Sequence, residues 1–319
     1  MRKMILFGML VGVLGALTSL SFAAFPEKPI QIINPYAAGG ETDMILRIIA
    51  NAAPPHFGQS VVVVNKTGGG GSVGMQYGAK SKPDGYTIVS GSLATLLLHP
   101  LMEKMPYSYK DFDVIGQFGI SQIGLFSKAN APWKDFQEFV KYTKEHPGEI
   151  KYGSAGAGTI GHLLMESISF TAGGLKMTHI PFAGSAPALT SLAGGHIHVS
   201  IGDVPPAIPM IEAKNISPLV ITNTQRVKTL SNVPALPELG HRGVDVWKAL
   251  LIPKGMPPEV AKHLVKALQA TLKDQNCIDP LAKIGQEPDF MGPEKLTPKM
   301  MEDNKWLAEI VDKLGLAKK

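Results

Sequence analysis

The residues best suited to bind an anion stand in a glycine-rich segment between a strand-like run and a helical pattern. The segment Pro35-Tyr36-Ala37-Ala38-Gly39-Gly40-Glu41-Thr42-Asp43 follows the apolar run Ile30–Asn34. Glycine lets backbone N–H groups approach a ligand closely, and a helix start adds unpaired donors and the positive end of a dipole. The sequence therefore predicts either an anion site or, more simply, a tight turn capped by Thr42 or Asp43.

A second glycine-rich segment, Gly156 to Gly161, matches the dinucleotide-binding pattern G-x-G-x-x-G. That pattern also needs an acidic residue near the end of the next strand, to hold a ribose. Met177-Thr178-His179-Ile180-Pro181 occupies that place and contains no acid. We therefore predict no dinucleotide and no other cofactor, and expect Ser154 and Thr159 to face a ligand at a second helix start.

Two more segments place polar or aromatic side chains where a strand is expected to give way to a helix. Asp203 precedes Pro205 and Pro206, and is predicted either to cap a helix or to accept a hydrogen bond from a ligand. In the segment His179–Ser185, Phe182 offers an apolar wall and Ser185 a helix cap. Open α/β sheets bind ligands at the carboxyl ends of their strands, where all these segments fall.

Catalysis and metal binding are the weaker interpretations. Ser72 lies in a G-x-S-x-G match, but four residues, Lys66-Thr67-Gly68-Gly69, separate it from the preceding strand, whereas a nucleophile elbow follows its strand directly. We expect Ser72 to be a helix cap; a serine hydrolase using Ser72, with Asp203 and His241 in the permitted order, stays an alternative. His196 and His198 share one face of a strand without an accompanying acidic or cysteine cluster, so no metal site is predicted.

The N-terminal residues predict export. Arg2 and Lys3 precede the apolar stretch Met4–Leu20, and small residues follow, so residues 1–23 are predicted to be a signal peptide cleaved near Ala23 or Ala24. The lone Cys277 forms no internal disulfide, which suits a bacterial periplasm better than a disulfide-rich extracellular module. The formal charge of +5 comes from scattered residues, so no nucleic-acid partner is expected.

The rest of the chain alternates between strand and helix patterns, which predicts an α/β fold with parallel sheets covered by helices. The expected strands are Ile30–Asn34, Ser60–Asn65, Thr87–Ser90, Ile150–Gly153, Lys176–Ile180, Val199–Ile201 and Ser217–Thr222. The expected helices are Asp43–Ala53, Val73–Lys80, Trp133–Glu145, Gly161–Thr171, Ala186–Ala193, Pro205–Ala213, Pro258–Leu272 and Pro298–Leu314.

Two long apolar runs, Val114–Phe126 and Val244–Pro253, are predicted to cross between two lobes. The first lobe would comprise residues 24–122 and 246–319, and the second lobe residues 123–245. Two α/β lobes joined by two strands form a cleft with a hinge.

The order of these segments resembles the solute-binding proteins of tripartite tricarboxylate transporters, the Bug family, along the whole mature chain. The family's pattern P-F-x-P-G-G-x-x-D is matched by residues 35–43. Further matches are Val62-Val63-Val64-Asn65-Lys66, Pro83-Asp84-Gly85-Tyr86-Thr87, Tyr152-Gly153-Ser154-Ala155-Gly156, His179-Ile180-Pro181-Phe182 and Asp203-Val204-Pro205. The resemblance implies a type II-like Venus-flytrap fold that closes on a small organic mono- or dicarboxylate.

The resemblance also implies ligand contacts, partners and a location. The residues implied to contact the ligand are Tyr36, Ala38, Gly39, Gly40, Ser92, Ser154, Ala155, Thr159, Phe182 and Asp203. The implied protein is a monomeric, non-enzymatic periplasmic receptor that delivers its ligand to membrane transporter subunits; a signalling receptor as partner is the alternative. Ala38 replaces the family's proline and Ala183 a frequent lysine. Glu41 is expected to face solvent at a helix start, or else to select the ligand by charge.

Overall fold

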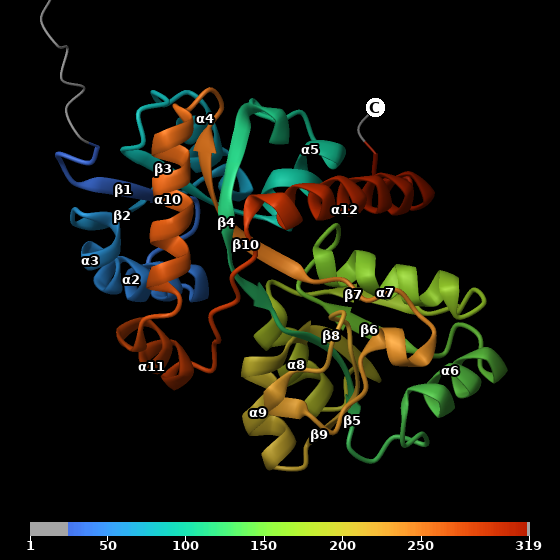
Figure 1. Cartoon of the computed structure of the whole chain (residues 1–319). Coiled ribbons are helices and arrows are strands. Elements are labelled where there is room, and N and C mark those ends of the chain that lie inside the picture. Colours follow the sequence, from blue (N-terminus) through green and yellow to red (C-terminus); the bar gives the residue numbers. More distant parts are fainter. Residues whose placement is uncertain (1–24, 318–319) are drawn as a thin grey trace, which may run out of the picture.

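The computed structural model describes residues 25–317, so the predicted signal peptide and its cleavage site lie outside the described residues. The described chain folds around two five-stranded sheets, one in each of two lobes (Figure 1). The two-lobed α/β fold expected from the sequence is confirmed, with one difference: both sheets are mixed rather than purely parallel.

The first sheet has the strand order β2-β1-β3-β10-β4. Strands β1 (Ile30–Asn34), β2 (Val61–Asn65) and β3 (Thr87–Ser92) are parallel, while β10 (Val246–Pro253) runs antiparallel to β3 and to β4 (Phe112–Ser121). The carboxyl ends of β1, β2 and β3 therefore lie at one edge, where the first glycine-rich segment begins.

Seven helices belong to the part of the chain that carries the first sheet. They are α2 (Glu41–Ala52), α3 (Pro54–Phe57), α4 (Ser72–Ala79), α5 (His99–Met102), α10 (Pro258–Thr271), α11 (Gln275–Lys283) and α12 (Pro293–Lys313). Helices α3, α5 and α11 were not expected, since two are only four residues long and α11 contains Pro280. Helix α12 starts five residues before the predicted Pro298, at a proline that fits a first helical position.

The second sheet has the order β7-β6-β8-β5-β9. Its strands are β5 (Ile123–Lys128), β6 (Lys151–Ser154), β7 (Thr178–Pro181), β8 (Val199–Asp203) and β9 (Ile216–Ile221), and its helices are α6 (Phe136–Glu145), α7 (Ile160–Thr171), α8 (Ser185–Ala193) and α9 (Val204–Glu212). Parallel strands β7, β6 and β8 end together, so the second glycine-rich segment, Phe182 and Asp203 gather at one edge.

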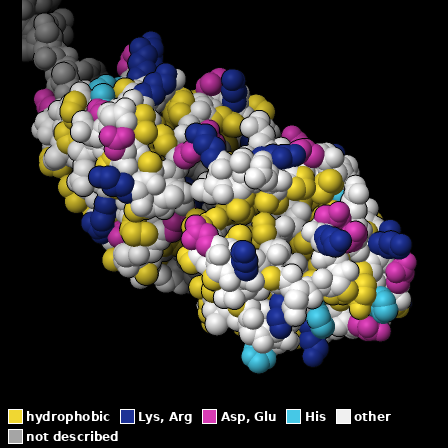
Figure 2. Space-filling model, turned by 90° about the horizontal axis from the view of Figure 1, so that it is seen from below, with side chains coloured by type: hydrophobic (Ala, Val, Ile, Leu, Met, Phe, Trp, Pro, Cys, Tyr) yellow, Lys and Arg dark blue, Asp and Glu magenta, His cyan; other side chains and the backbone are white. Residues whose placement is uncertain are grey.

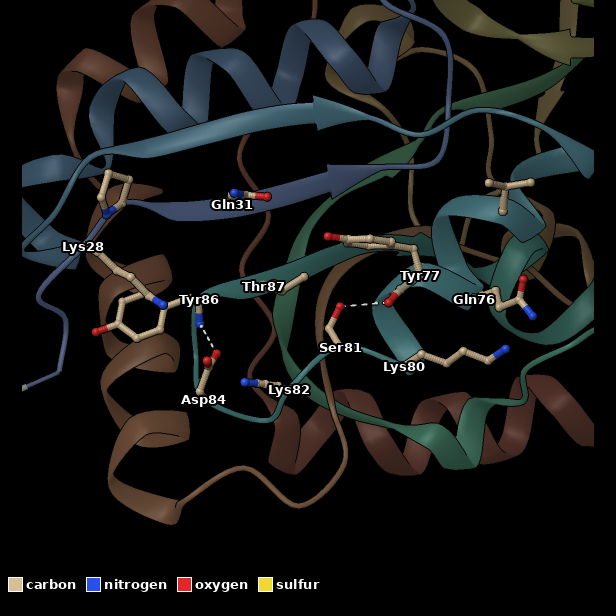
Figure 3. Close-up of a pocket in the computed structure, with 12 residues that line it drawn as sticks. Lys28, Gln31, Gln76, Tyr77, Lys80, Ser81, Lys82, Asp84, Tyr86 and Thr87 are labelled. Atoms are coloured by element: carbon tan, nitrogen blue, oxygen red, sulfur yellow. Dashed lines mark hydrogen bonds between the residues drawn. The ribbon is translucent and has the colours of Figure 1, made fainter.

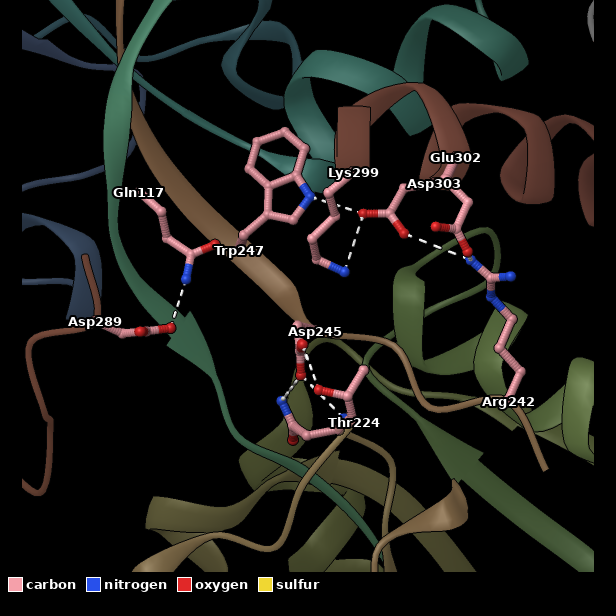
Figure 4. Close-up of polar contacts among 10 residues, drawn as sticks. Gln117, Thr224, Arg242, Asp245, Trp247, Asp289, Lys299, Glu302 and Asp303 are labelled. Carbon is pink, nitrogen blue, oxygen red and sulfur yellow. Dashed lines mark hydrogen bonds and ion pairs between the residues drawn. The ribbon is translucent and has the colours of Figure 1, made fainter. Parts of the chain in front are cut away.

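The chain passes between the lobes twice, at Gln122 between β4 and β5 and between β9 and β10 (Figure 1). Polar contacts hold this crossing. Asn223 Nδ2 donates to Ser121 O (2.9 Å), and Thr224 Oγ1 donates to Asp245 Oδ2 (2.6 Å) (Figure 4). Arg242 also reaches from the loop before β10 to Glu302 of α12 (3.0 Å). Two crossing strands are the expected hinge; the residue limits of the lobes stay a prediction.

Apolar side chains from both sheets are removed from water, including Ile32, Leu125 and Trp247. On the face that Figure 2 shows, Lys and Arg side chains are scattered among acidic ones over both lobes instead of forming one basic patch. Within residues 25–317, no helix has the length and apolar character needed to cross a bilayer.

Candidate functional site

The first glycine-rich segment is a loop whose N–H groups are partly used within the loop itself. Gly39 has a φ of +78°, a left-handed conformation that glycine adopts without strain. Its N–H donates to Asp43 Oδ2 (2.9 Å), and the N–H of Gly40 donates to Ala37 O (3.3 Å). Since the first turn of a helix leaves its own N–H groups without backbone partners, the donors left for a ligand are those of residues 41–43.

Asp43 fixes the shape of this loop. Its carboxylate is 2% exposed and accepts hydrogen bonds from Gly39 N, Arg47 Nε (2.9 Å) and Asn65 Nδ2 (2.8 Å). Burial opposes ionisation, but these hydrogen bonds and the Arg47 charge outweigh it, so the pKa of Asp43 lies well below its usual range. The cap position of α2 is Gly40. Asp43 does not cap the helix but accepts a hydrogen bond from Gly39 in the preceding loop.

Tyr36 and Ser92 meet above the ends of β1 and β3. The Tyr36 hydroxyl lies 3.0 Å from Ser92 Oγ, which in turn lies 3.2 Å from Thr95 Oγ1. Burial raises the pKa of Tyr36 above its ordinary value, so its phenol stays protonated and can donate to an anion.

Glu41 and Lys248 form an ion pair beside these hydroxyls that the sequence analysis did not foresee. Lys248 Nζ lies 2.8 Å from Glu41 Oε2, and Gln286 Nε2 donates to Glu41 Oε1 (2.9 Å). The Lys248 side chain is 6% exposed and that of Glu41 43%. Lys248 is opposite Ser92 in the β10–β3 ladder, which puts both side chains on one face of the sheet. Glu41 keeps 43% of its side chain exposed in the first turn of α2, as expected for a helix-start charge, and it also pairs with a buried lysine that was not predicted.

Asp203 brings the second lobe to this group. It occupies the cap position of α9 without a side-chain cap bond, and its N–H donates to Ser185 Oγ (2.8 Å). Burial and the Glu41 charge together raise the pKa of Asp203 to about 6, although Lys248 and the hydrogen bond with Ser185 oppose the change. We call Tyr36, Glu41, Ser92, Lys248 and Asp203 the interlobe cluster, because its members come from the first lobe, the hinge strand and the second lobe.

A hollow of about 290 Å³ opens between the lobes. Pro205 on its wall lies two residues after Asp203, and Gly285 immediately precedes Gln286. Its lining comes from α9, the crossing segment and the end of α11, namely Gln122, Pro205, Ile208, Pro209, Thr229, Ile284 and Gly285. Residues of both lobes therefore line this space, and two of them are close in sequence to Asp203 and Gln286.

The second glycine-rich segment carries hydroxyls and neutral rings. Ser154 Oγ and Thr159 Oγ1 both donate to Gly156 O (3.0 and 2.7 Å), and Ser154 Oγ lies 2.8 Å from His179 Nε2. The His179 ring stacks between Tyr152 and His162, with centroids 4.7 and 4.2 Å away. Burial and the neighbouring His162 lower the pKa of His179 to about 4, so this ring is neutral near pH 7.

The other predicted contact residues surround the same two loops. Ala38 is exposed beside Gly39, while Ala155 and Phe182 are half-buried in the second lobe. The N–H of Phe182 donates to Ser154 O (3.0 Å), which joins the loop after β7 to the second glycine-rich segment.

The structure gives no support to a Ser72 nucleophile. Ser72 is the first residue of α4, the cap position is Gly71, and no side-chain cap bond forms, so the predicted cap is also wrong. His241 Nδ1 lies 2.9 Å from Thr171 Oγ1, and Asp203 lies beside Ser185. A Cβ on Gly74 would come within 2.9 Å of Pro35 Cα, so close packing of α4 explains this glycine.

One histidine of the pair in the second lobe, His198, has a structural role. His198 Nδ1 accepts the N–H of Lys151 (2.9 Å), joining β6 to the start of β8. In the described residues, no group of three or more His, Cys, Asp or Glu side chains is placed to hold a metal ion.

A separate hollow of about 710 Å³ lies wholly in the first lobe (Figure 3). Lys28, Lys80 and Lys82 surround it together with Tyr77 and Tyr86. One of these lysines, Lys28, places its Nζ 4.3 Å from the centroid of the Tyr86 ring. Lys66, which does not line the hollow, places its Nζ 4.1 Å from the centroid of the Tyr77 ring. No second-lobe residue lines this hollow, so lobe closure cannot cover a ligand there.

Comparison with known proteins now identifies the family. The sequence pattern described as the tripartite tricarboxylate transporter family receptor matches residues 45–316. The chain belongs to this receptor family. The resemblance inferred from the sequence is thereby confirmed, and the family is one of solute-binding receptors.

Relatives of this receptor match nearly end to end. The chain is 33% identical over 318 residues to the UPF0065 protein in the gbd 5′ region of Cupriavidus necator, covering 96% of each chain. The crystal structure of a ligand-free TctC solute-binding protein from Polaromonas has a TM-score of 0.83 at 30% identity, over 91% of this chain and 99% of that one. Rpa4515 of R. palustris, solved with adipate, has a TM-score of 0.74 at 29% identity, over 92% and 99%.

Proposed function

We propose that this receptor captures a small organic carboxylate between its lobes in the periplasm and presents it to the membrane subunits of a tripartite tricarboxylate transporter. It works by lobe closure, as a monomer, and without catalysis. Closure around the ligand excludes water and creates a surface that the membrane subunits can recognise. The related Rpa4515, which was solved with adipate, supports a carboxylate as the ligand class.

The observation that carries this proposal is the buried cation at the junction of the lobes. Lys248 is 6% exposed, and its neighbours Ser92 and Tyr36 offer hydroxyl donors. A buried ammonium costs free energy unless an anion accompanies it; the partly exposed Glu41 has that role in the ligand-free protein, and an arriving carboxylate can take it over. The neutral second loop would then close over the rest of the ligand.

The proposed contacts fall into two groups. On the first-lobe side the contacts are Tyr36, Ala38, Gly39, Gly40, Ser92 and Lys248. The first loop contributes mainly through its shape and through the N–H groups at the start of α2. On the second-lobe side they are Ser154, Ala155, Thr159, Phe182 and Asp203. Since Gly39 and Gly40 already bond within their loop, we assign them to the shape of the site rather than to direct donation.

Isothermal calorimetry and thermal unfolding against a library of mono- and dicarboxylates test this function. We expect at least one acid to bind and to raise the melting temperature, because a ligand that binds only the folded state stabilises it by mass action. Stabilisation by sugars or metal cations alone, with no response to any carboxylate, would refute the proposal. Small-angle scattering with and without the best acid should show compaction, and ester hydrolysis should be absent in the wild type and in Ser72→Ala alike.

A further inference from the structure

The charges of the interlobe cluster restrict which carboxylates it can accept. Glu41 pairs with Lys248 at 2.8 Å, which uses the one cation of the cluster. Asp203 adds a carboxyl group that ionises around neutral pH, and Tyr36 stays uncharged. With Asp203 ionised, the empty cluster therefore carries one more negative than positive charge.

A ligand carboxylate that binds Lys248 must take the place of Glu41 there. The Lys248 side chain is nine-tenths buried and its ammonium has no aligned hydrogen bond, so its charge is compensated by the ion pair with Glu41. Displacement leaves Glu41 with Gln286 as its remaining partner. The Glu41 side chain is 43% exposed here, and lobe closure over a ligand would remove it from water. An ionised side chain without a counter-charge costs far more in such a closed site than in water, so a ligand that brings a replacement charge is favoured.

Only an acid that also carries a positive group can replace Lys248 as the partner of Glu41. A dicarboxylate adds two negative charges to a cluster that already has an excess, and leaves Glu41 and Asp203 facing its second carboxylate. An amino acid brings one carboxylate for Lys248 and one ammonium for Glu41, so each charge exchanges one partner for another. Like charges at close range in a closed site repel strongly, and complementary ones select the ligand.

We propose, on the basis of the function above, that this receptor selects a zwitterionic amino acid over a dicarboxylate of similar length, and that Glu41 sets this choice. Glu41 receives the ligand ammonium, Lys248 the ligand carboxylate, and the Tyr36 and Ser92 hydroxyls donate to the same carboxylate. Gln286 holds Glu41 in place from the end of α11.

The test is calorimetry with acids matched in size: pentanoate, glutarate, 2-aminopentanoate and 4-aminobutanoate, at about pH 7.5. We expect one of the two amino acids to bind roughly 10-fold more tightly than pentanoate and roughly 100-fold more tightly than glutarate. The ligand ammonium gains Glu41 as a partner in the closed site, whereas the second carboxylate of glutarate faces like charges there. In Glu41→Gln, the advantage over pentanoate should disappear and glutarate should improve. Glu259→Gln, which changes an exposed first-turn glutamate of α10, should behave as wild type.

The outcomes separate this inference from the proposed function. Tighter binding of glutarate than of both amino acids overturns the inference while the carboxylate receptor stands. An ammonium preference that survives in Glu41→Gln overturns the assignment to Glu41. Failure of every acid in the series and the wider library removes the proposed function itself. Circular dichroism and melting temperature of each variant show that a lost preference is not lost folding.

Discussion

The two glycine-rich loops, one after β1 and one after β6, have equivalent positions in their sheets but opposite electrostatic character. The first loop is surrounded by charges: Asp43 is a buried carboxylate within it, and Glu41 at its end pairs with Lys248. The second loop has hydroxyls, Gly156 O and a neutral His179. The same strand–loop–helix arrangement therefore presents charged groups to the ligand in one lobe and uncharged groups in the other.

The largest expected effect tests the charged side of this comparison. Lys248→Met keeps the unbranched shape of the side chain but removes the cation, and should weaken binding of the best acid roughly 100-fold or more, about 3 kcal/mol. Calorimetry measures this loss. Lys254→Met, at an exposed lysine just beyond β10, is the matched control and should leave the affinity unchanged. Equal binding by both variants would mean that the first lobe does not recognise charge through Lys248.

The next effect concerns stability. Asp43→Ala removes a buried carboxylate that accepts four hydrogen bonds and should lower the free energy of unfolding by about 2–4 kcal/mol. Thr159→Val in the second loop should lower it by about 1 kcal/mol. Because the folded pKa of Asp43 is depressed, its contribution is complete above its unfolded pKa of about 3.9 and is lost as the pH falls further. Urea unfolding across the acid range should therefore show a shallower acid loss in Asp43→Ala; equal costs in the two loops would contradict the comparison.

Asp203 should show the opposite pH dependence. Its pKa is raised to about 6 in the folded state, so between its unfolded pKa and that value the folded protein holds more protons. Stability should therefore fall as the pH rises from about 4 to 6 and stay lower above that range. Asp203→Asn should remove this fall and gain about 1–3 kcal/mol at neutral pH, measured by urea unfolding at several pH values. No gain would indicate that Asp203 is better solvated than its position between the lobes implies.

The sequence predicts those features of this site that are marked by residues neighbouring in the chain. Strand β1 was predicted to the residue because its apolar run ends at a polar asparagine, and the loops after β1 and β6 were found because glycines and hydroxyls mark them. The two crossing runs were found from their continuous apolar character. Local patterns thus located the fold and the loops.

The charge pairing could not be predicted in the same way. Lys248 meets Ser92 only because β10 returns to the first sheet, and Gln286 meets Glu41 from the end of a helix interrupted by Pro280. A lone lysine inside the apolar run Val246–Pro253 was the available signal for Lys248. Its partner depends on strand order, which the residue pattern does not specify.

The smallest expected effect tests the neutral side of the comparison. His179 is uncharged above about pH 5, because burial and His162 lower its pKa to about 4. His179→Gln can still hydrogen-bond to Ser154, so affinity for the best acid should change less than about threefold. The pH profile of binding between roughly pH 5.5 and 8 should stay unchanged.

The free energy of unfolding should behave differently. A histidine whose pKa is depressed in the folded state destabilises the protein as the pH falls below its unfolded pKa of about 6.5, and His179→Gln should remove this loss of stability in acid. Calorimetry and urea unfolding on the same samples separate the two effects. A shifted pH profile of binding in His179→Gln would place a titrating charge in the second loop and end the division of roles between the lobes.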